Sequence, residues 1–174
     1  MEVLVREAES NEYEAIHDLV KRAFETAPVS DGDEQDYVLY LRASERHIFE
    51  LELVAEDDDI IIGHIMLTKT KIETNEKVIQ ELLLSPISVQ LEYRNKGVGK
   101  LLVKESFEIA KRLGYSAVFV VGDPEYYLRF GFKQTTNFGI KNKSDIEEKY
   151  VMACELHEGY LKNKERNNKY YITV

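Results

Sequence analysis

The sequence predicts a mixed α/β (α+β) fold, in which a central sheet is flanked by helices. Two strongly apolar runs, at residues 78–89 and 116–121, have the composition of buried strands. Between them, apolar residues recur at helical spacing from Leu101 to Leu113, which indicates a β-α-β unit. Nearer the N-terminus, two helical patterns precede a pair of strands, so helices and strands share one sheet-based core.

The first quarter of the chain predicts a short strand and two helices. Residues 3–6 form a β-rich run, and Ser10 is a plausible N-cap for the helix that follows and that Pro28 ends. A second helix is expected over residues 34–42. The apolar positions of the first helix are Ile16, Leu19, Val20, Ala23 and Phe24.

A hairpin is predicted next. Residues 48–55 alternate as a strand, the acidic segment 56–59 is the turn, and residues 60–70 return as the second strand. The acidic tip lacks the spaced ligands and the glycine of a calcium loop, so we interpret it as a solvated turn.

The second half continues the sheet. Pro86 lies inside the strand 78–89 and marks a bulge or an edge there, because proline cannot donate to a ladder. Gly114 closes the long helix, and residues 124–129 suit a short helix. From Phe132 onward the pattern is of strands separated by loops, with strands at about 150–156 and 170–174.

Composition favours one globular domain over residues 1–174. The formal charge of -9 argues against nucleic acid as a partner. It mildly favours a cationic substrate, but ordinary solubilising surface is the favoured interpretation of the acidic excess. The single cysteine, Cys154, allows neither an intrachain disulfide nor a thiolate zinc site, and it fits a reducing compartment. We see neither a signal peptide nor an apolar run of about 20 residues, so the expected location is the cytoplasm, without membrane attachment. Whether the chain is a monomer or a homodimer stays open.

The most informative segment is a glycine-bearing loop between a strand and the long helix, residues 93–102. Its glycines let the backbone turn tightly and approach a ligand, and the helix start offers unpaired N–H groups. Arg94, Lys96 and Lys100 add positive charge in an otherwise acidic protein. The loop therefore predicts an anion site that suits a pyrophosphate.

Three nucleotide patterns compete for this loop. A P-loop requires Ser or Thr after Gly99-Lys100 and a glycine five positions before Gly99, and a dinucleotide fingerprint requires a glycine where Leu102 stands. The pattern [RQ]-x-x-G-x-[GA] matches fully from Arg94 to Gly99. It is the coenzyme A pyrophosphate loop of the GNAT acetyltransferases, and in this segment the sequence resembles that superfamily.

The resemblance extends over most of the chain. Residues 87–94 resemble the end of the GNAT fourth strand, with Leu91 where proline is usual, and residues 116–121 resemble the fifth. Residues 127–132 look like the Y-x-x-x-G-F signature. Segments 84–89, 122–127 and 155–161 are similar to the YhbS-like branch of predicted bacterial acetyltransferases.

The resemblance implies a GNAT fold, with a mostly antiparallel sheet whose fourth and fifth strands splay apart, and an acetyl-CoA-dependent N-acetyltransferase. Acetyl-CoA would be the cosubstrate, an unidentified amine the acceptor, and no metal would be needed. Tyr127 would be the general acid that protonates the departing thiolate. Transfer would be direct, in a ternary complex. The implied CoA contacts are Ile87, Ser88, Val89, Arg94, Asn95, Lys96, Gly97, Val98, Gly99 and Lys100.

Several roles remain open. The general base stays open: Glu81, His64 and water are candidates, with His64 more often a structural residue in such a position, and the amine arriving already deprotonated is a further alternative. Val120 stands where many relatives have an asparagine seven residues before the tyrosine. Cys154 is interpreted as a small apolar core residue. A longer acyl-CoA, or a CoA-binding sensor without turnover, are the alternative functions.

Overall fold

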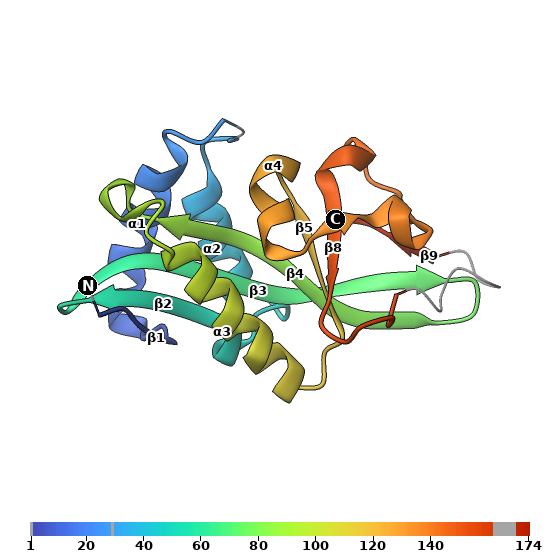
Figure 1. The fold of residues 1–174 in the computed structure, drawn as a ribbon, viewed down its shortest axis with the longest axis horizontal. Coiled ribbons are helices and arrows are strands. Elements are labelled where there is room, and N and C mark those ends of the chain that lie inside the picture. The colour runs from blue at the N-terminus through green and yellow to red at the C-terminus, as the bar shows by residue number, and fades with distance from the viewer. Residues whose placement is uncertain (1, 29, 162–169) are drawn as a thin grey trace. The chain divides into compact units, whose positions relative to one another are not determined.

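The structure is a computed structural model that describes residues 2–28, 30–161 and 170–174 (Figure 1). The chain divides into two compact units. The first unit is Met1–Thr68 with Ser85–Ile109, and the second is Lys69–Leu84 with Ala110–Val174. The boundaries fall inside β3 (Ile60–Thr74), β4 (Val78–Val89) and α3 (Val98–Arg112), so the chain crosses between the units within regular elements.

The first unit contains an antiparallel ladder of β1 (Leu4–Glu7), β2 (Glu52–Asp57) and the first part of β3. The hairpin between β2 and β3 turns at Asp58 and Asp59, whose φ angles of 49° and 63° are left-handed. Aspartate tolerates this conformation and is common in tight hairpin turns. The prediction of a turn at the acidic tip is therefore confirmed.

Helices cover both faces of this ladder. Side chains alternate between the faces of a strand, and Val54 and Met66 pack under α1 (Tyr13–Phe24) and α2 (Glu34–Arg42). On the opposite face, a Cβ at Gly63 would lie 3.0 Å from Leu102 and 3.1 Å from Val98, so the missing side chain lets α3 approach closely. Figure 1 shows α3 across one face of β2 and β3, with α1 and α2 behind them.

The second unit is built around β5 (Ala117–Val121). β5 pairs in parallel with residues Leu82–Leu84 of β4, and antiparallel with β8 (Val151–Glu155), which pairs with the short β6 (Lys133–Gln134). The predicted β-α-β unit is confirmed by this parallel pairing. The end of β3 pairs with β9 (Tyr170–Ile172), and β9 with β7 (Ile140–Asn142).

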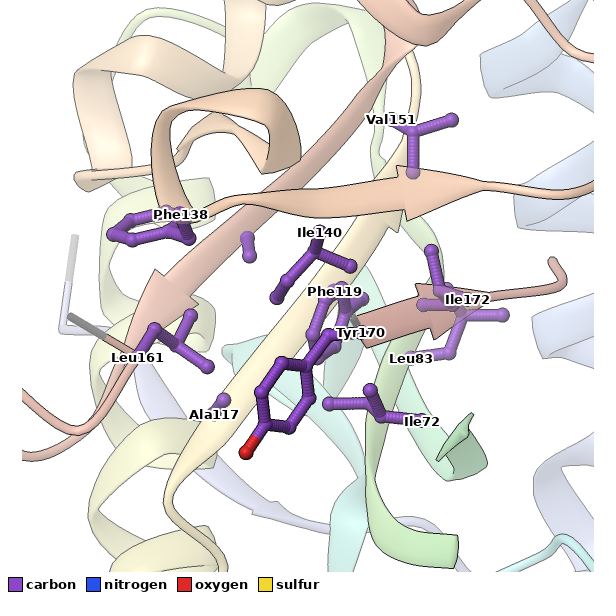
Figure 2. Packing of buried hydrophobic residues seen from close by; sticks show 11 residues of the cluster. Ile72, Leu83, Ala117, Phe119, Phe138, Ile140, Val151, Leu161, Tyr170 and Ile172 are labelled. Atoms are coloured by element: carbon purple, nitrogen blue, oxygen red, sulfur yellow. The ribbon is translucent and has the colours of Figure 1, made fainter. Parts of the chain in front are cut away.

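The core of the second unit gathers side chains from several strands and from the connections between them. Figure 2 shows Phe119 of β5 at the centre of this cluster, among apolar side chains from β3, β4, β7, β8 and β9. The buried members are Ile72, Leu83, Ala117, Phe119, Phe138, Ile140, Val151, Ala153, Leu161, Tyr170 and Ile172. The continuous apolar run predicted as a strand buried on both faces is β5, in which residues 117–120 are all buried.

Several predicted boundaries were wrong. Ser10 does not cap α1: it begins a 3-10 turn, in which the Glu12 carboxylate accepts a hydrogen bond from the Glu9 N–H at 2.8 Å. The strand predicted from residue 48 starts only at Glu52, because Phe49–Leu51 form a 3-10 turn that buries Leu51 and exposes Phe49. A local apolar pattern cannot distinguish such a turn from the first residues of a strand.

The predicted short helix also changes character along its length. α4 covers only Pro124–Tyr127, and a 3-10 turn, Leu128–Phe130, completes the segment before Gly131 at φ 90°. Pro86 is buried within β4, and the β4–β5 ladder covers residues Leu82–Leu84, just before that proline. The pairing with β5 thus ends before Pro86, and the bulge or edge expected at this proline stays a prediction.

Candidate active site

The predicted site residues divide between the two units. Residues 87–100, which include every predicted CoA contact, lie in the first unit, and Tyr127 lies in the second.

The predicted anion loop joins β4 to α3 in two tight steps. A 3-10 turn, Leu91–Tyr93, follows the strand, and then Asn95 and Gly97 take left-handed φ angles of 60° and 87°. α3 begins at Val98, and its first backbone bond of the kind found in α-helices runs from the Leu101 N–H to the Gly97 carbonyl at 3.1 Å. Helix geometry leaves the preceding N–H groups without an intrahelical acceptor. They form the positive end of a helix dipole, where an anion is stabilised.

Space beside the loop is open. A Cβ added at Gly97 would meet no atom within 4 Å among the described residues. Lys96 and Lys100 are exposed, and the Lys96 ammonium lies 5.3 Å from the centroid of the Tyr93 ring. The loop therefore combines open volume, free helix N–H groups and positive side chains, which is what binding of a pyrophosphate requires.

The Arg94 side chain makes hydrogen bonds that the sequence did not reveal. Its guanidinium donates to the Ala23 carbonyl at 2.7 Å, to the Thr26 hydroxyl at 2.9 Å and to the Val89 carbonyl at 3.3 Å. These acceptors lie at the C-terminal end of α1 and the end of β4. The side chain thus ties the loop to α1 and to the end of β4. Only the tertiary placement of α1 beside the loop could show this.

The end of β4 is closely packed. Ile87, Ser88 and Val89 are buried, and the Ser88 carbonyl oxygen lies 3.3 Å from the Cβ position of Gly63. The Ser88 hydroxyl has no hydrogen-bond partner among the described residues. Burying a hydroxyl without a hydrogen-bond partner costs free energy. Among residues 87–89, Ser88 is therefore the one whose side chain would be stabilised most by a polar partner.

Tyr127 is held in an aromatic cluster at the end of α4. Asp123 caps that helix by accepting from the Glu125 N–H at 3.0 Å. The half-buried Tyr127 ring makes edge contacts with Tyr126, at 5.0 Å between centroids, and with Phe132, at 5.7 Å. Burial, with a smaller electrostatic effect of Tyr126, raises the pKa of the Tyr127 hydroxyl well above its usual value. The hydroxyl is therefore protonated at neutral pH and able to donate.

Both side chains considered as general bases have structural partners. His64 is fully buried on the face covered by α1 and α2, with Nε2 3.1 Å from Glu52. Burial, opposed by Glu52, lowers the pKa of His64. Glu81 accepts from the Ser116 and Ala117 N–H groups, both at 3.0 Å, and from the Tyr160 hydroxyl at 2.6 Å. Both side chains are therefore engaged in structural contacts.

The remaining predictions concern Cys154 and metals. Burial raises the pKa of the Cys154 thiol to about 11, so it is not a thiolate at neutral pH. No group of three or more His, Cys, Asp or Glu side chains in the described ranges is arranged to hold a metal ion. Of the helices in the described part of the chain, none combines the length and the apolarity that a membrane crossing requires.

Comparison with known proteins shows the family to which this chain belongs. A family model described as an acetyltransferase (GNAT) domain matches residues 4–135. The chain therefore belongs to the GNAT acetyltransferase family and is an acyltransferase by class. The sequence resemblance on which the site residues were chosen is confirmed at the level of the family.

Individual relatives come from bacteria. The uncharacterized N-acetyltransferase YhbS of Escherichia coli strain K12 is 32% identical over 124 residues, which are 71% of this chain and 69% of that protein. The uncharacterized N-acetyltransferase YjhQ of the same strain is 31% identical over 112 residues, 64% of this chain and 62% of that protein.

Solved structures agree on the fold. The crystal structure of the GNAT family N-acetyltransferase YhbS from Escherichia coli in complex with CoA matches with a TM-score of 0.81 and 24% identity, over 99% of this chain and 89% of that chain. A GNAT family acetyltransferase from Brucella melitensis in complex with acetyl-CoA matches with a TM-score of 0.70 and 24% identity, over 90% and 89% of the two chains. The predicted GNAT fold is confirmed.

Proposed function

We propose that this protein transfers the acetyl group of acetyl-CoA to the amine of a small molecule or peptide, by direct attack in a ternary complex. One observation supports this most strongly: the loop from Arg94 to Lys100 opens α3 with free N–H groups, two exposed lysines and open space at Gly97. The CoA and acetyl-CoA complexes of the structural neighbours add to this support. We also propose that residues 1–174 act as one catalytic domain.

In the proposed reaction the pyrophosphate lies on the amides of residues 95–100, and the pantetheine arm runs along residues 87–89 of β4. The amine nitrogen attacks the thioester carbonyl carbon, a C–N bond forms, and the C–S bond breaks. Tyr127 donates its proton to the sulfur as the thiolate leaves. The proton that the amine loses returns to Tyr127 through water, so Tyr127 begins and ends the cycle protonated.

The raised pKa of Tyr127 fits this role. A tyrosinate would repel the developing thiolate, whereas a protonated hydroxyl stabilises it by donating a hydrogen bond. Since the net proton transfer is from the amine to the sulfur, Tyr127 need not remain ionised at any stage.

The acceptor would bind beside α1 and α2. A pocket of about 100 Å³ in the first unit is lined by residues from both helices and their connection, including Phe24, Glu25, Glu34 and Gln35. Lys21 also lines the pocket, and the Glu34 carboxylate already accepts from the Asp31 and Gly32 N–H groups. Glu25 is therefore the carboxylate that would steer a cationic amine. The pocket itself does not identify the amine.

The test is release of CoA thiol from acetyl-CoA with a panel of primary amines, polyamines and peptide N-termini, using wild type and Tyr127→Phe. We expect amine-dependent turnover, with kcat lower by about 10²–10⁴-fold in the variant because a general acid is lost. The dissociation constant for acetyl-CoA should be nearly unchanged. Wild-type turnover by Tyr127→Phe, where chemistry limits the rate, would contradict the assignment of this residue.

Two other outcomes would replace the proposal. Tight CoA binding without turnover of any amine would indicate a sensor. Stronger competition by longer acyl-CoA molecules, with faster transfer of the longer chain, would indicate a different acyl donor.

A further inference from the structure

The ring of Tyr127 lies directly against the backbone of Gly122. A Cβ placed on Gly122 would be 2.4 Å from Tyr127 Cε2, 3.1 Å from Cδ2 and 3.4 Å from Cζ. Non-bonded carbon atoms normally approach to about 3.5–4.0 Å. Any other residue at position 122 would therefore displace the ring or the backbone.

The conformation of Gly122 does not itself call for glycine. The glycines with positive φ include Gly114 and Gly131, but Gly122 is not among them. The requirement at position 122 comes from the tyrosine ring rather than from the backbone.

Backbone hydrogen bonds hold the chain on each side of this contact. The Gly122 N–H donates to the Tyr150 carbonyl at 3.0 Å, and the N–H groups of Tyr126 and Tyr127 both donate to the Asp123 carbonyl, at 3.1 Å and 3.2 Å. The buried Phe132 ring and the Tyr126 ring also contact the tyrosine. Since the backbone is held, an added side chain would act mainly on the ring.

We propose that Gly122 is a positioning residue that fixes where the Tyr127 hydroxyl lies. The inference rests on the proposed role of Tyr127 as the proton donor. Restoring a normal carbon contact moves Cε2 by about 1 Å, and a misplacement of about 1 Å can cost about 10²-fold in rate. Rotation about the Cβ–Cγ bond would leave the hydroxyl in place, because the oxygen lies on that axis, but the Tyr126 and Phe132 rings oppose this rotation. A tilt about the Cα–Cβ bond moves the hydroxyl at least as far as Cε2.

A double-mutant cycle tests this with Gly122→Ala, Tyr127→Phe and the combination. We expect Gly122→Ala to lower kcat by about 10–10²-fold, with an unchanged dissociation constant for acetyl-CoA. In the Tyr127→Phe background the same substitution should lower kcat no further, because the hydroxyl that it displaces is already absent. An equal loss in both backgrounds would overturn the inference.

Gly114→Ala is the matched control. Gly114 has φ 90° and no atom within 4 Å of its Cβ position among the described residues, so alanine there strains the backbone without touching Tyr127. We expect it to lower the melting temperature and leave kcat unchanged.

The outcomes separate this inference from the proposed function. Wild-type kcat in Gly122→Ala, together with a large loss in Tyr127→Phe, would overturn only the positioning role. Full activity of Tyr127→Phe would overturn the proton-donor assignment itself.

If Gly122→Ala folds poorly, a stability measurement tests instead whether position 122 accommodates the Tyr127 ring. Removing the ring removes the clash, so Gly122→Ala should lower the melting temperature in the wild-type background and have little effect in Tyr127→Ala. The same drop in both backgrounds would show that the ring is not what position 122 accommodates.

Discussion

At the scale of single residues, the proposed CoA loop depends on backbone shape more than on side chains. Gly97 combines a left-handed φ with open space, whereas Arg94 places its guanidinium against the end of α1 and the end of β4. The loop pattern thus contains two different requirements, one for ligand access and one for anchoring. Each can be tested separately.

Gly97→Asp should abolish binding of CoA, because it strains the backbone, fills the open space and places a negative charge where the pyrophosphate would lie. Isothermal titration calorimetry with CoA measures this, with circular dichroism to check folding. Gly114→Asp is the matched control, since Gly114 has a similar φ and equally open surroundings at the other end of α3. Unchanged CoA affinity in folded Gly97→Asp, or equal affinity of the wild type for ATP and CoA, would refute the assignment.

Arg94→Ala should mainly lower stability, whereas Lys96→Ala should mainly weaken CoA binding. Arg94→Ala removes charged hydrogen bonds to Ala23 and Thr26 and should lower the free energy of unfolding by about 1.5 kcal/mol. Lys96→Ala should leave stability nearly unchanged but weaken CoA binding, because it removes an exposed positive charge beside the loop. Urea denaturation and CoA titration of both variants check this; a stable Arg94→Ala would show that the tether contributes little.

At the scale of elements, a buried charged cluster joins α2, β2 and β3 in the first unit. Glu52 of β2 accepts from Arg42 Nε at 3.1 Å, and its carboxylate lies 2.7 Å from His47 Nε2 and 3.1 Å from His64 Nε2. Arg42 also lies over the Tyr13 ring of α1, 3.7 Å from its centroid. The cluster fixes both helices on the sheet, and it gives His64 a structural partner.

The cluster makes stability depend on pH. Burial alone would raise the pKa of Glu52, but the hydrogen bonds and charges of His64 and Arg42 outweigh it and lower the pKa to about 2. Because this pKa is depressed on folding, the stabilisation is present above the ordinary value of 4.5 and is lost as the pH falls toward 2. The lowered pKa of His64 acts in the same direction: stability declines as the pH falls below 6.5, since the unfolded chain then binds the proton more readily.

Glu52→Gln should therefore lower the free energy of unfolding by about 3–5 kcal/mol at neutral pH, because a buried arginine loses its counter-charge. The loss should shrink below pH 4.5, where the wild type itself loses the carboxylate. Thermal melts between about pH 3 and pH 8 measure both effects. Glu56→Gln on the same strand is the control: its partner Arg6 is partly exposed and keeps Glu12, so about 0–1 kcal/mol is expected. Equal losses in both variants would contradict a special role for Glu52.

At the scale of the whole molecule, the prediction is direct transfer without an acyl-enzyme. Cys154 is buried, its pKa is raised to about 11, and its sulfur contacts the Phe130 carbonyl oxygen at 3.9 Å. A thiol in this state is a poor nucleophile. Both substrates must therefore be bound together before either product leaves.

Cys154→Ala should keep full kcat, and initial-rate plots at several fixed amine concentrations should intersect. Mass spectrometry after incubation with acetyl-CoA alone should detect no acetylated Cys154. Parallel lines, an acetyl adduct on Cys154 and an inactive Cys154→Ala would together establish a ping-pong route instead.

The sequence by itself determined the class of fold, the family and the position of the predicted anion loop. The helix at residues 34–42, the strand at 78–89 and the parallel β-α-β unit followed from hydrophobic period, because that period records which face of an element is buried. The Arg94-x-x-Gly97-x-Gly99 pattern was readable because its conformation is set locally, by left-handed residues and a helix start.

Only the tertiary structure decided which partners Arg94, Glu52 and Tyr127 contact. Arg94 binds the end of α1, Glu52 gathers Arg42, His47 and His64, and Gly122 makes room for the Tyr127 ring. No local pattern contains these contacts, because Arg94 and Ala23 lie 71 residues apart in sequence, and the shorter-range pairs depend on side-chain packing. A period or a motif reports how a residue relates to its neighbours in the chain, whereas charge pairing and ring contact depend on which surfaces folding brings together.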